Sequence, residues 1–99
     1  MIYGTLGAEY LAELNTPLLD PVWVVNPIAD GSKQCFVKWT SLEVVEPKLS
    51  TGEAAVCALA RSLDGVGLVN TRQALGAISY ELRVRYLRLL NQSVERMTK

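Results

Sequence analysis

Histidine is absent from this chain of 99 residues. Histidine is the commonest general acid or base near neutral pH, and it is also the commonest metal ligand. Its absence removes the usual hydrolase triads and most zinc sites. It also removes the ordinary titrating switch between about pH 5 and pH 8, so we expect assembly in that range to depend little on pH.

Cysteine is scarce, with only Cys35 and Cys57 present. The two residues have neither the C-x-x-C spacing nor the histidine partners of a zinc site, so we predict no metal and no cofactor. We interpret both as small buried hydrophobic residues. A disulfide between them would require an oxidising compartment, and the sequence leaves open whether the two thiols lie close together.

The chain has no excess of charge and no long apolar run. Ten basic residues balance ten acidic residues, whereas a dedicated nucleic-acid binder usually has a basic excess. No apolar run approaches the roughly 20 residues that span a bilayer, so we predict no membrane partner. The first residues lack the basic segment of a secretory signal, and we expect a cytoplasmic location.

Pairs of residues that could carry catalysis are also missing. A cysteine nucleophile would have no histidine base to activate it. Glu9 and Glu13 share a helix face that we expect to be solvated, and Glu43 and Glu46 flank a predicted strand end. No two carboxylates are expected in an apolar cleft, where pKa shifts arise. We therefore predict no catalytic residue and no enzyme.

The composition that remains is that of a single globular domain over residues 1–99, with 49% hydrophobic and 20% charged residues. A chain this short buries only about two-thirds of its unfolded surface, so a partner surface would add to its stability. The pattern predicts an α+β fold. We expect a short N-terminal helix, an antiparallel β-hairpin or three-stranded meander, and two C-terminal helices packed on the sheet.

The N-terminal helix is predicted from Thr5 to about Asn15. Leu6, Tyr10 and Leu14 recur at the helical spacing i, i+4, i+8. Pro17 ends the helix, because the residues just before a proline avoid helical backbone angles.

The hairpin is predicted from two β-rich runs around a tight turn. The first run is 22–25, and the second alternates over 33–40. Asp30 and Gly31 between them are typical of a two-residue type I′ turn. Pro27 cannot donate to a ladder, so the first strand is expected at an edge of the sheet.

That turn would set the register of the hairpin. It places Val24 opposite Val37, Trp23 opposite Lys38, and Val25 opposite Phe36. Trp23, Val25 and Phe36 would then share one face. Either a helix of the same chain covers this face, or the face is an open binding surface with aromatic anchors.

After Thr40 the apolar residues of this run move from odd-numbered to even-numbered positions. We expect either a bulge at Thr40–Ser41 or a third short strand through Leu42 and Val44, with the β region ending at Pro47.

The next helix has a clear start and stop. Ser50 and Glu53 match the S-x-x-E capping box. Val56, Leu59 and Leu63 form its apolar stripe, and Asp64–Gly65 ends it. We interpret the glycines at positions 65 and 67 as turn residues and not as a phosphate loop, because no phosphate-binding motif surrounds them.

A single long helix is predicted from Asn70 or Thr71 to about Glu95. Its apolar residues form two adjacent stripes that cover about half of the circumference, more than the roughly 100° arc of an ordinary surface helix. The first stripe is Leu75, Ile78, Leu82, Tyr86 and Leu89. The second is Leu87, Leu90, Val94 and Met97, with Val84 and Tyr80 beyond it.

This second stripe leads to the first functional hypothesis, a non-enzymatic protein–protein interaction or assembly module. The chain would form a homodimer, or bind another protein, through Leu87, Leu90 and Val94. The competing interpretation is a central helix that its own domain covers on both sides.

Two other hypotheses remain. Arg83, Arg85 and Arg88, with interleaved tyrosines, could bind RNA or DNA in a small phage or viral protein, although three arginines on a helix are more often a solvated face. Arg72 and Arg83 lie on the apolar side, where pairing or snorkelling is the ordinary role. Alternatively, a monomeric regulator could cap a partner through the face of Trp23 and Phe36.

Overall fold

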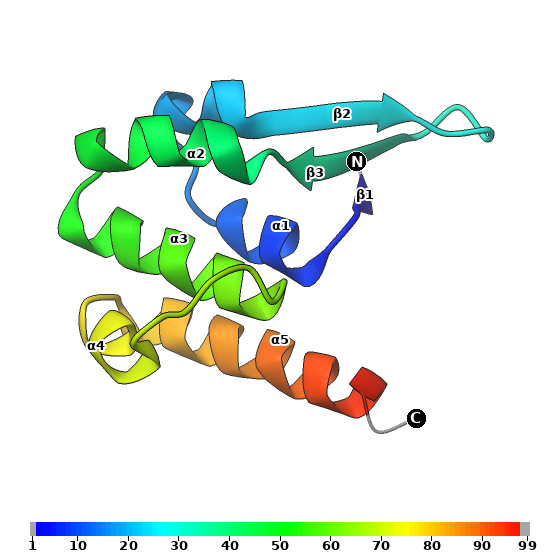
Figure 1. The fold of residues 1–99 in the computed structure, drawn as a ribbon. Coiled ribbons are helices and arrows are strands. Elements are labelled where there is room, and N and C mark those ends of the chain that lie inside the picture. Colours follow the sequence, from blue (N-terminus) through cyan, green and yellow to red (C-terminus); the bar gives the residue numbers. More distant parts are fainter. Residues whose placement is uncertain (1, 98–99) are drawn as a thin grey trace.

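A computed structural model describes residues 2–97 and has the predicted α+β class (Figure 1). The chain also contains two short 3₁₀ helices, η1 and η2. In chain order the elements are β1 (Ile2–Tyr3), α1 (Leu6–Leu11), η1 (Pro17–Val22), β2 (Trp23–Pro27), β3 (Lys33–Val37), α2 (Trp39–Val45), η2 (Glu46–Lys48), α3 (Thr51–Leu63), α4 (Thr71–Gly76) and α5 (Tyr80–Met97).

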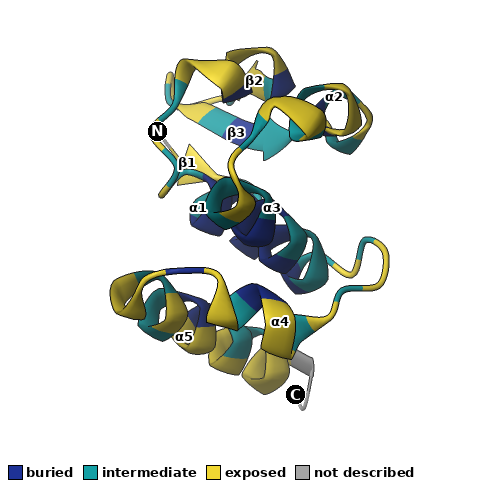
Figure 2. Ribbon diagram, turned by 90° about the vertical axis from the view of Figure 1, so that its left-hand side faces the viewer, coloured by how far each residue is buried: buried dark blue, intermediate teal, exposed yellow. Residues whose placement is uncertain are grey.

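These elements form three layers (Figure 1). The sheet, η1 and α2 make the first layer, α1 and α3 make the middle layer, and α4 and α5 make the last. The buried residues concentrate on α1 and α3 (Figure 2). The core therefore lies on both sides of the middle layer.

The sheet has the order β1-β3-β2, with β2 antiparallel and β1 parallel to β3. The hairpin is confirmed, and β2 lies at an edge as Pro27 predicts. The three-stranded meander is wrong, because the third strand comes from the N-terminal end, at Ile2–Tyr3, and not from the residues after β3.

The register of the hairpin differs by one residue from the prediction. Trp23 pairs with Val37, Val24 with Phe36, and Val25 with Cys35. Phe36 therefore lies on the opposite face from Trp23 and Val25, and the predicted three-residue face does not form.

A longer turn causes this shift. The Ile28 N–H donates to the Ser32 carbonyl at 3.0 Å, which leaves three residues in the loop. Gly31 has a φ of 86°, whereas no residue other than glycine has a positive φ among residues 2–97. A type I′ turn needs positive φ at two central residues, so this turn is instead the three-residue kind with a left-handed glycine. The Asp30 carboxylate accepts a hydrogen bond from the Ser32 N–H at 2.9 Å and stabilises the loop.

The segment predicted as a strand end, bulge or third strand is the helix α2. Leu42 is fully buried, Trp39 and Val45 are partly buried, and Val44 is 72% exposed. The inward residues Trp39, Leu42 and Val45 are three positions apart, as on one face of a helix. The shift of the apolar residues from odd to even positions after Thr40 therefore marks the start of a helix and not a bulge. α2 packs on η1, and this tertiary contact outweighs the β propensity of its valines.

The N-terminal helix is shorter than predicted and ends at Leu11. Thr5 caps it, because its side-chain oxygen accepts from the Ala8 N–H at 3.1 Å. The segment from there to Thr16 folds as turns: the N–H groups of Glu13 and Leu14 bond three residues back, at 3.0 Å each. Two such turns bring the chain round to η1.

The start of α1 is held against the end of α3. The Asp64 carboxylate accepts hydrogen bonds from the Gly7 N–H and the Thr5 hydroxyl, each at 2.8 Å. A side chain at Gly7 would collide with the Ala60 carbonyl oxygen and with Asp64. Glycine at this position therefore allows a close approach of the two helices.

The predicted features of α3 are confirmed. The Ser50 hydroxyl accepts from the Glu53 N–H, and the Glu53 carboxylate accepts from the Ser50 N–H, which completes the capping box. Val56 and Leu59 are fully buried, and Gly65 has a φ of 70° directly after the helix. On its outer side, Arg61 forms a 2.6 Å ion pair with Glu46 and lies 6.0 Å from the centre of the Trp39 ring, so α3 also holds α2 and η2.

The predicted long C-terminal helix is broken into α4 and α5. Asn70 caps α4 as expected, with its side chain accepting from the Gln73 N–H at 3.1 Å. Gly76 ends α4, and Ser79 starts α5 by accepting from the Leu82 N–H at 3.4 Å. The break places Ile78 in the core at 7% exposure. A glycine followed by a capping serine is an ordinary stop and start signal.

α5 packs on α1 and α3 (Figure 1). The expectation that it lies across the sheet is therefore corrected, because the middle layer separates the two. One face of α5 meets this layer, and the opposite face has no layer beyond it.

Gly7→Ala is expected to destabilise the fold, because the new methyl group would lie 2.5 Å from the Ala60 carbonyl oxygen. Overpacking of this kind costs about 1–3 kcal/mol of unfolding free energy, measurable as a lower midpoint in urea. Gly76→Ala is the matched control, since no atom beyond its chain neighbours and the backbone of its own helix lies within 4 Å of the added methyl group. That change should leave stability unchanged or raise it by about 0.5–1 kcal/mol. Equal midpoints for the two variants would contradict the close contact.

Candidate interaction surfaces

The outer face of α5 carries large apolar side chains in solvent. Tyr80 is 74% exposed, Leu87 is 52% exposed, and Val94 is 50% exposed. Figure 2 shows α5 in the outermost layer, with exposed stretches along it. The interpretation in which the domain covers both stripes is therefore not what the structure has: the second stripe is largely open.

These three residues recur at intervals of seven, from 80 to 87 to 94. Seven residues are nearly two helical turns, so they form one straight line along the helix. We call this line the α5 seam. Leu90 lies beside the seam but is partly buried and packs on the core. The side chain of Met97, expected in the same stripe, lies outside the described part of the chain.

The inner stripe of α5 fastens the helix to the domain. Tyr86 and Leu89 are 2% and 1% exposed. The Tyr10 hydroxyl donates to the Leu82 carbonyl at 2.9 Å, and the Tyr86 hydroxyl shares a 2.9 Å hydrogen bond with Ser62. The rings of Tyr10 and Tyr86 meet edge to face, with centroids 5.6 Å apart. The open seam therefore lies on a rigidly held helix.

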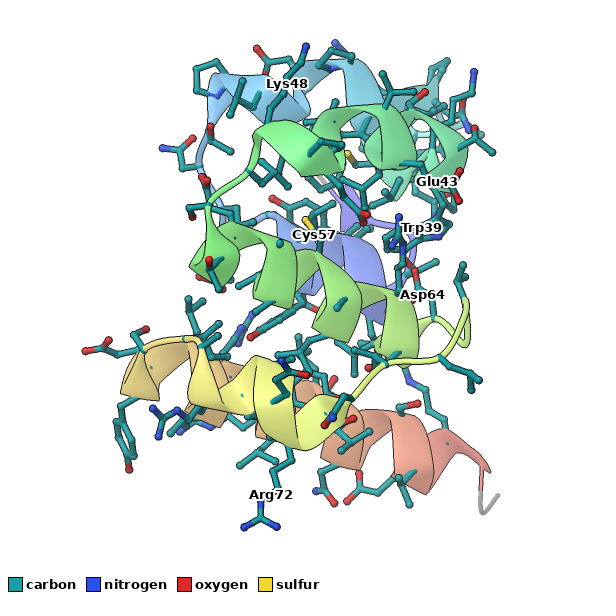
Figure 3. All side chains as sticks on the ribbon, turned by 60° about the vertical axis from the view of Figure 1, so that its left-hand side comes forward. Trp39, Glu43, Lys48, Cys57, Asp64 and Arg72 are labelled. Atoms are coloured by element: carbon teal, nitrogen blue, oxygen red, sulfur yellow. The ribbon has the colours of Figure 1, made fainter. Side chains whose placement is uncertain are left out.

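The three candidate nucleic-acid residues point in different directions. Arg85 pairs with Glu9 at 3.0 Å and with Glu13 at 3.2 Å, so its charge is compensated within the domain. The guanidinium of Arg83 donates to the Ile78 carbonyl at 3.2 and 3.3 Å, and Arg88 is exposed. Arg72 is also exposed and extends away from α4 (Figure 3). These arginines do not gather into one basic patch.

The predicted aromatic face of the hairpin is divided by the register. Phe36 lies on the outer face of the sheet, where its ring closely approaches Gly4. Trp23 and Val25 lie on the inner face with Cys35, and Val25 is 43% exposed. This inner face is therefore covered only in part.

A cavity of about 400 Å³ remains beneath the uncovered part of the inner face. Its strand residues are Tyr3, Trp23, Val25 and Cys35. Its other wall is the segment after α1 together with η1, contributed by Ala12, Leu14, Asn15, Thr16 and Asp20. We call this the inner-face pocket. Sequence reasoning identified Trp23 and Val25 here but missed Tyr3 and Asp20.

The two cysteines are free and buried. Cys35 is on the sheet at 3% exposure, and Cys57 is fully buried on α3 (Figure 3). Burial, together with the negative charge of Glu46, raises the pKa of Cys57 to about 12. The interpretation of both as small buried hydrophobic residues is confirmed.

Among residues 2–97, no group of three or more His, Cys, Asp or Glu side chains has an arrangement that could hold a metal ion. No helix of the described part combines the length and the apolar character that a membrane span needs.

Comparisons with protein-family models, with curated proteins and with solved structures each found no match to this chain. Its function is therefore inferred from the geometry of its own residues.

The stability of the fold is expected to fall at alkaline pH because of Cys57. The folded state holds the thiol proton to a pKa of about 12, whereas an unfolded thiol loses it near about pH 8.5. The stabilisation is complete below the unfolded value and is lost as the pH rises towards the folded value. Burial raises the pKa of Tyr10 in the same direction.

Chemical denaturation at about pH 8 and about pH 10.5 would measure this loss. The Cys57 thiol should lower the unfolding free energy by about 2 kcal/mol between these two pH values. Cys57→Ala is expected to flatten the pH dependence, although it lowers stability at both pH values by leaving a small cavity. If the unfolding free energies of the variant and the parent fell in parallel, the buried neutral thiol would be contradicted.

Proposed function

We propose that this protein is a non-enzymatic assembly module that pairs with a second copy of itself through the α5 seam. The observation that carries the proposal is the row of Tyr80, Leu87 and Val94, which are 74%, 52% and 50% exposed on a helix whose other face is anchored in the core. A coiled-coil seam has apolar residues at two positions, a and d, of each seven-residue repeat, and this row fills one of the two.

A second copy fits this row better than an unrelated partner does, because the row is symmetric about its centre. Tyr80 and Val94 lie seven residues to either side of Leu87. A two-fold axis through Leu87 would set each leucine against its copy and each tyrosine against a valine, which pairs a large side chain with a smaller one. Such isologous contacts are the commonest way in which soluble proteins form dimers.

The flanks of the seam are compatible with an interface. Val84 is partly buried on one side, and Arg83 and Leu90 lie on the other. Charged residues such as Glu81 and Arg88 lie away from the row and would form a solvated rim. The α5 helix is about 27 Å long at about 1.5 Å per residue, so the whole row can engage one partner helix.

The alternatives are supported less by the geometry. Nucleic-acid binding would rest on Arg83 and Arg88, since Arg85 is paired with two glutamates. A regulator acting through one face of Trp23 and Phe36 would need both rings on the same side of the sheet, and they lie on opposite sides. Cytoplasmic location stays a prediction.

Leu87→Asp is the test of the dimer. It places two carboxylates near the two-fold axis, so the dimer dissociation constant should rise by about 100-fold or more, measured by sedimentation equilibrium. Because Leu87 is half exposed, the folded monomer should keep its circular dichroism spectrum. Leu90 is a poorer choice, since it packs on the core.

Gln92→Asp is the matched control: it adds the same charge at an exposed position of α5 away from the seam and should leave the dimer intact. A monomeric parent at millimolar concentration, or equal weakening by both substitutions, would overturn the proposal.

A further inference from the structure

The inner-face pocket is a second candidate site, and it shares no residue with the α5 seam. Its volume of about 400 Å³ lies within the roughly 300–1,000 Å³ that is usual for pockets that hold small ligands. Side chains from three strands and from η1 converge on it, so residues far apart in the sequence build one cavity.

Two aromatic rings form adjoining walls of this pocket. The centroids of Tyr3 and Trp23 lie 6.3 Å apart, and their planes are tilted by 49°. Tyr3 is 41% exposed, and Trp23 packs against the core but is only partly buried, so both residues keep surface that a ligand can contact. The face of an aromatic ring carries partial negative charge and attracts a cation within about 6 Å.

The one charged side chain that lines the pocket is Asp20. No lysine or arginine lines the pocket. Among the described residues, no basic side chain forms an ion pair with the Asp20 carboxylate at 4.0 Å or less. At the floor, burial raises the pKa of the Cys35 thiol, which is therefore neutral at physiological pH. The lining thus offers an uncompensated negative charge and no positive one.

Polar groups at the rim complete the lining. Asn15 and Thr16 lie between α1 and η1, on the same wall as Asp20. Their amide and hydroxyl groups can accept hydrogen bonds from an ammonium ion or from a hydroxyl group that it carries.

We propose that the inner-face pocket binds a small organic cation, an ammonium group packed against the Tyr3 and Trp23 rings with Asp20 as its counter-charge. Rings alone would accept any apolar ligand, and a carboxylate alone would bind a cation only weakly in water. The combination selects a ligand that is both apolar and positively charged, of which a quaternary ammonium is the best example. Anionic ligands are disfavoured because no basic side chain lines the pocket.

The probe for this test is choline, and its control is the uncharged carbon analogue in which a tert-butyl group replaces the trimethylammonium group. The two molecules have nearly the same shape and differ in charge. Isothermal titration calorimetry on the unmodified chain should give saturable choline binding in the millimolar range or tighter, and about tenfold weaker binding of the analogue. Equal affinities, or no saturable signal with choline, would overturn the proposal.

Substitutions then assign the site. Asp20→Asn should weaken choline binding about threefold to fivefold, whereas Glu43→Gln removes an exposed carboxylate from α2 and should change nothing. Tyr3→Leu should weaken binding, and Tyr3→Phe should retain it, because a phenyl ring keeps its negatively charged face. Equal effects of Asp20→Asn and Glu43→Gln would contradict the assignment.

A second readout uses Trp23 itself. In a Trp39→Phe variant Trp23 is the single tryptophan, and choline should change its fluorescence over the concentration range found by calorimetry. Calorimetric binding without any fluorescence change would place choline elsewhere on the protein and refute this pocket. Loss of the α5 dimer would leave these results untouched, so the two proposals can fail separately.

Discussion

The close contact between α1 and α3 is the constraint on which the rest of the fold depends. Gly7 lets the two backbones approach, and the Asp64 carboxylate accepts from the Gly7 N–H and the Thr5 hydroxyl. α1 is only six residues long, too short to be a stable helix alone. Yet it contacts β1, β3, α3 and α5. Holding this one helix in place therefore joins the sheet to the helical layers.

Sequence patterns predicted those elements whose signals are local. The Ser50–Glu53 capping box, the Asn70 cap and the edge position signalled by Pro27 each depend on a few neighbouring residues, and all three are confirmed. Two of the errors came from non-local choices, whereas the hairpin register and the break between α4 and α5 depend on local turn and capping residues that were misread or missed. α2 is a helix because it packs on η1, and β1 is a strand because β3 lies beside it, neither of which a local pattern contains.

The two candidate surfaces also differ in how far local sequence patterns could predict them. Helical periodicity predicted Leu87 and Val94 of the α5 seam, because exposure on a helix follows from which stripe meets the core. It also placed Leu90 in that stripe and Tyr80 beyond it, whereas Leu90 packs on the core and Tyr80 is exposed in line with Leu87 and Val94. The inner-face pocket could be predicted only in part. Trp23 was recognised as an aromatic anchor, but Tyr3 and Asp20 join it through the parallel β1–β3 pairing and the turns after α1. One added residue in the hairpin loop also moved Phe36 to the other face.

The partners of α1 lie far along the chain, which affects how the protein is made. Thr5 and Gly7 bond to Asp64, and the Tyr10 hydroxyl bonds to the Leu82 carbonyl. A ribosome that has released only the first half of the chain has supplied neither partner. Helix α1 therefore forms late, although it is synthesised before both of its partners. Residues 2–97 therefore fold as one cooperative unit once most of them have left the ribosome, and not element by element as each is synthesised.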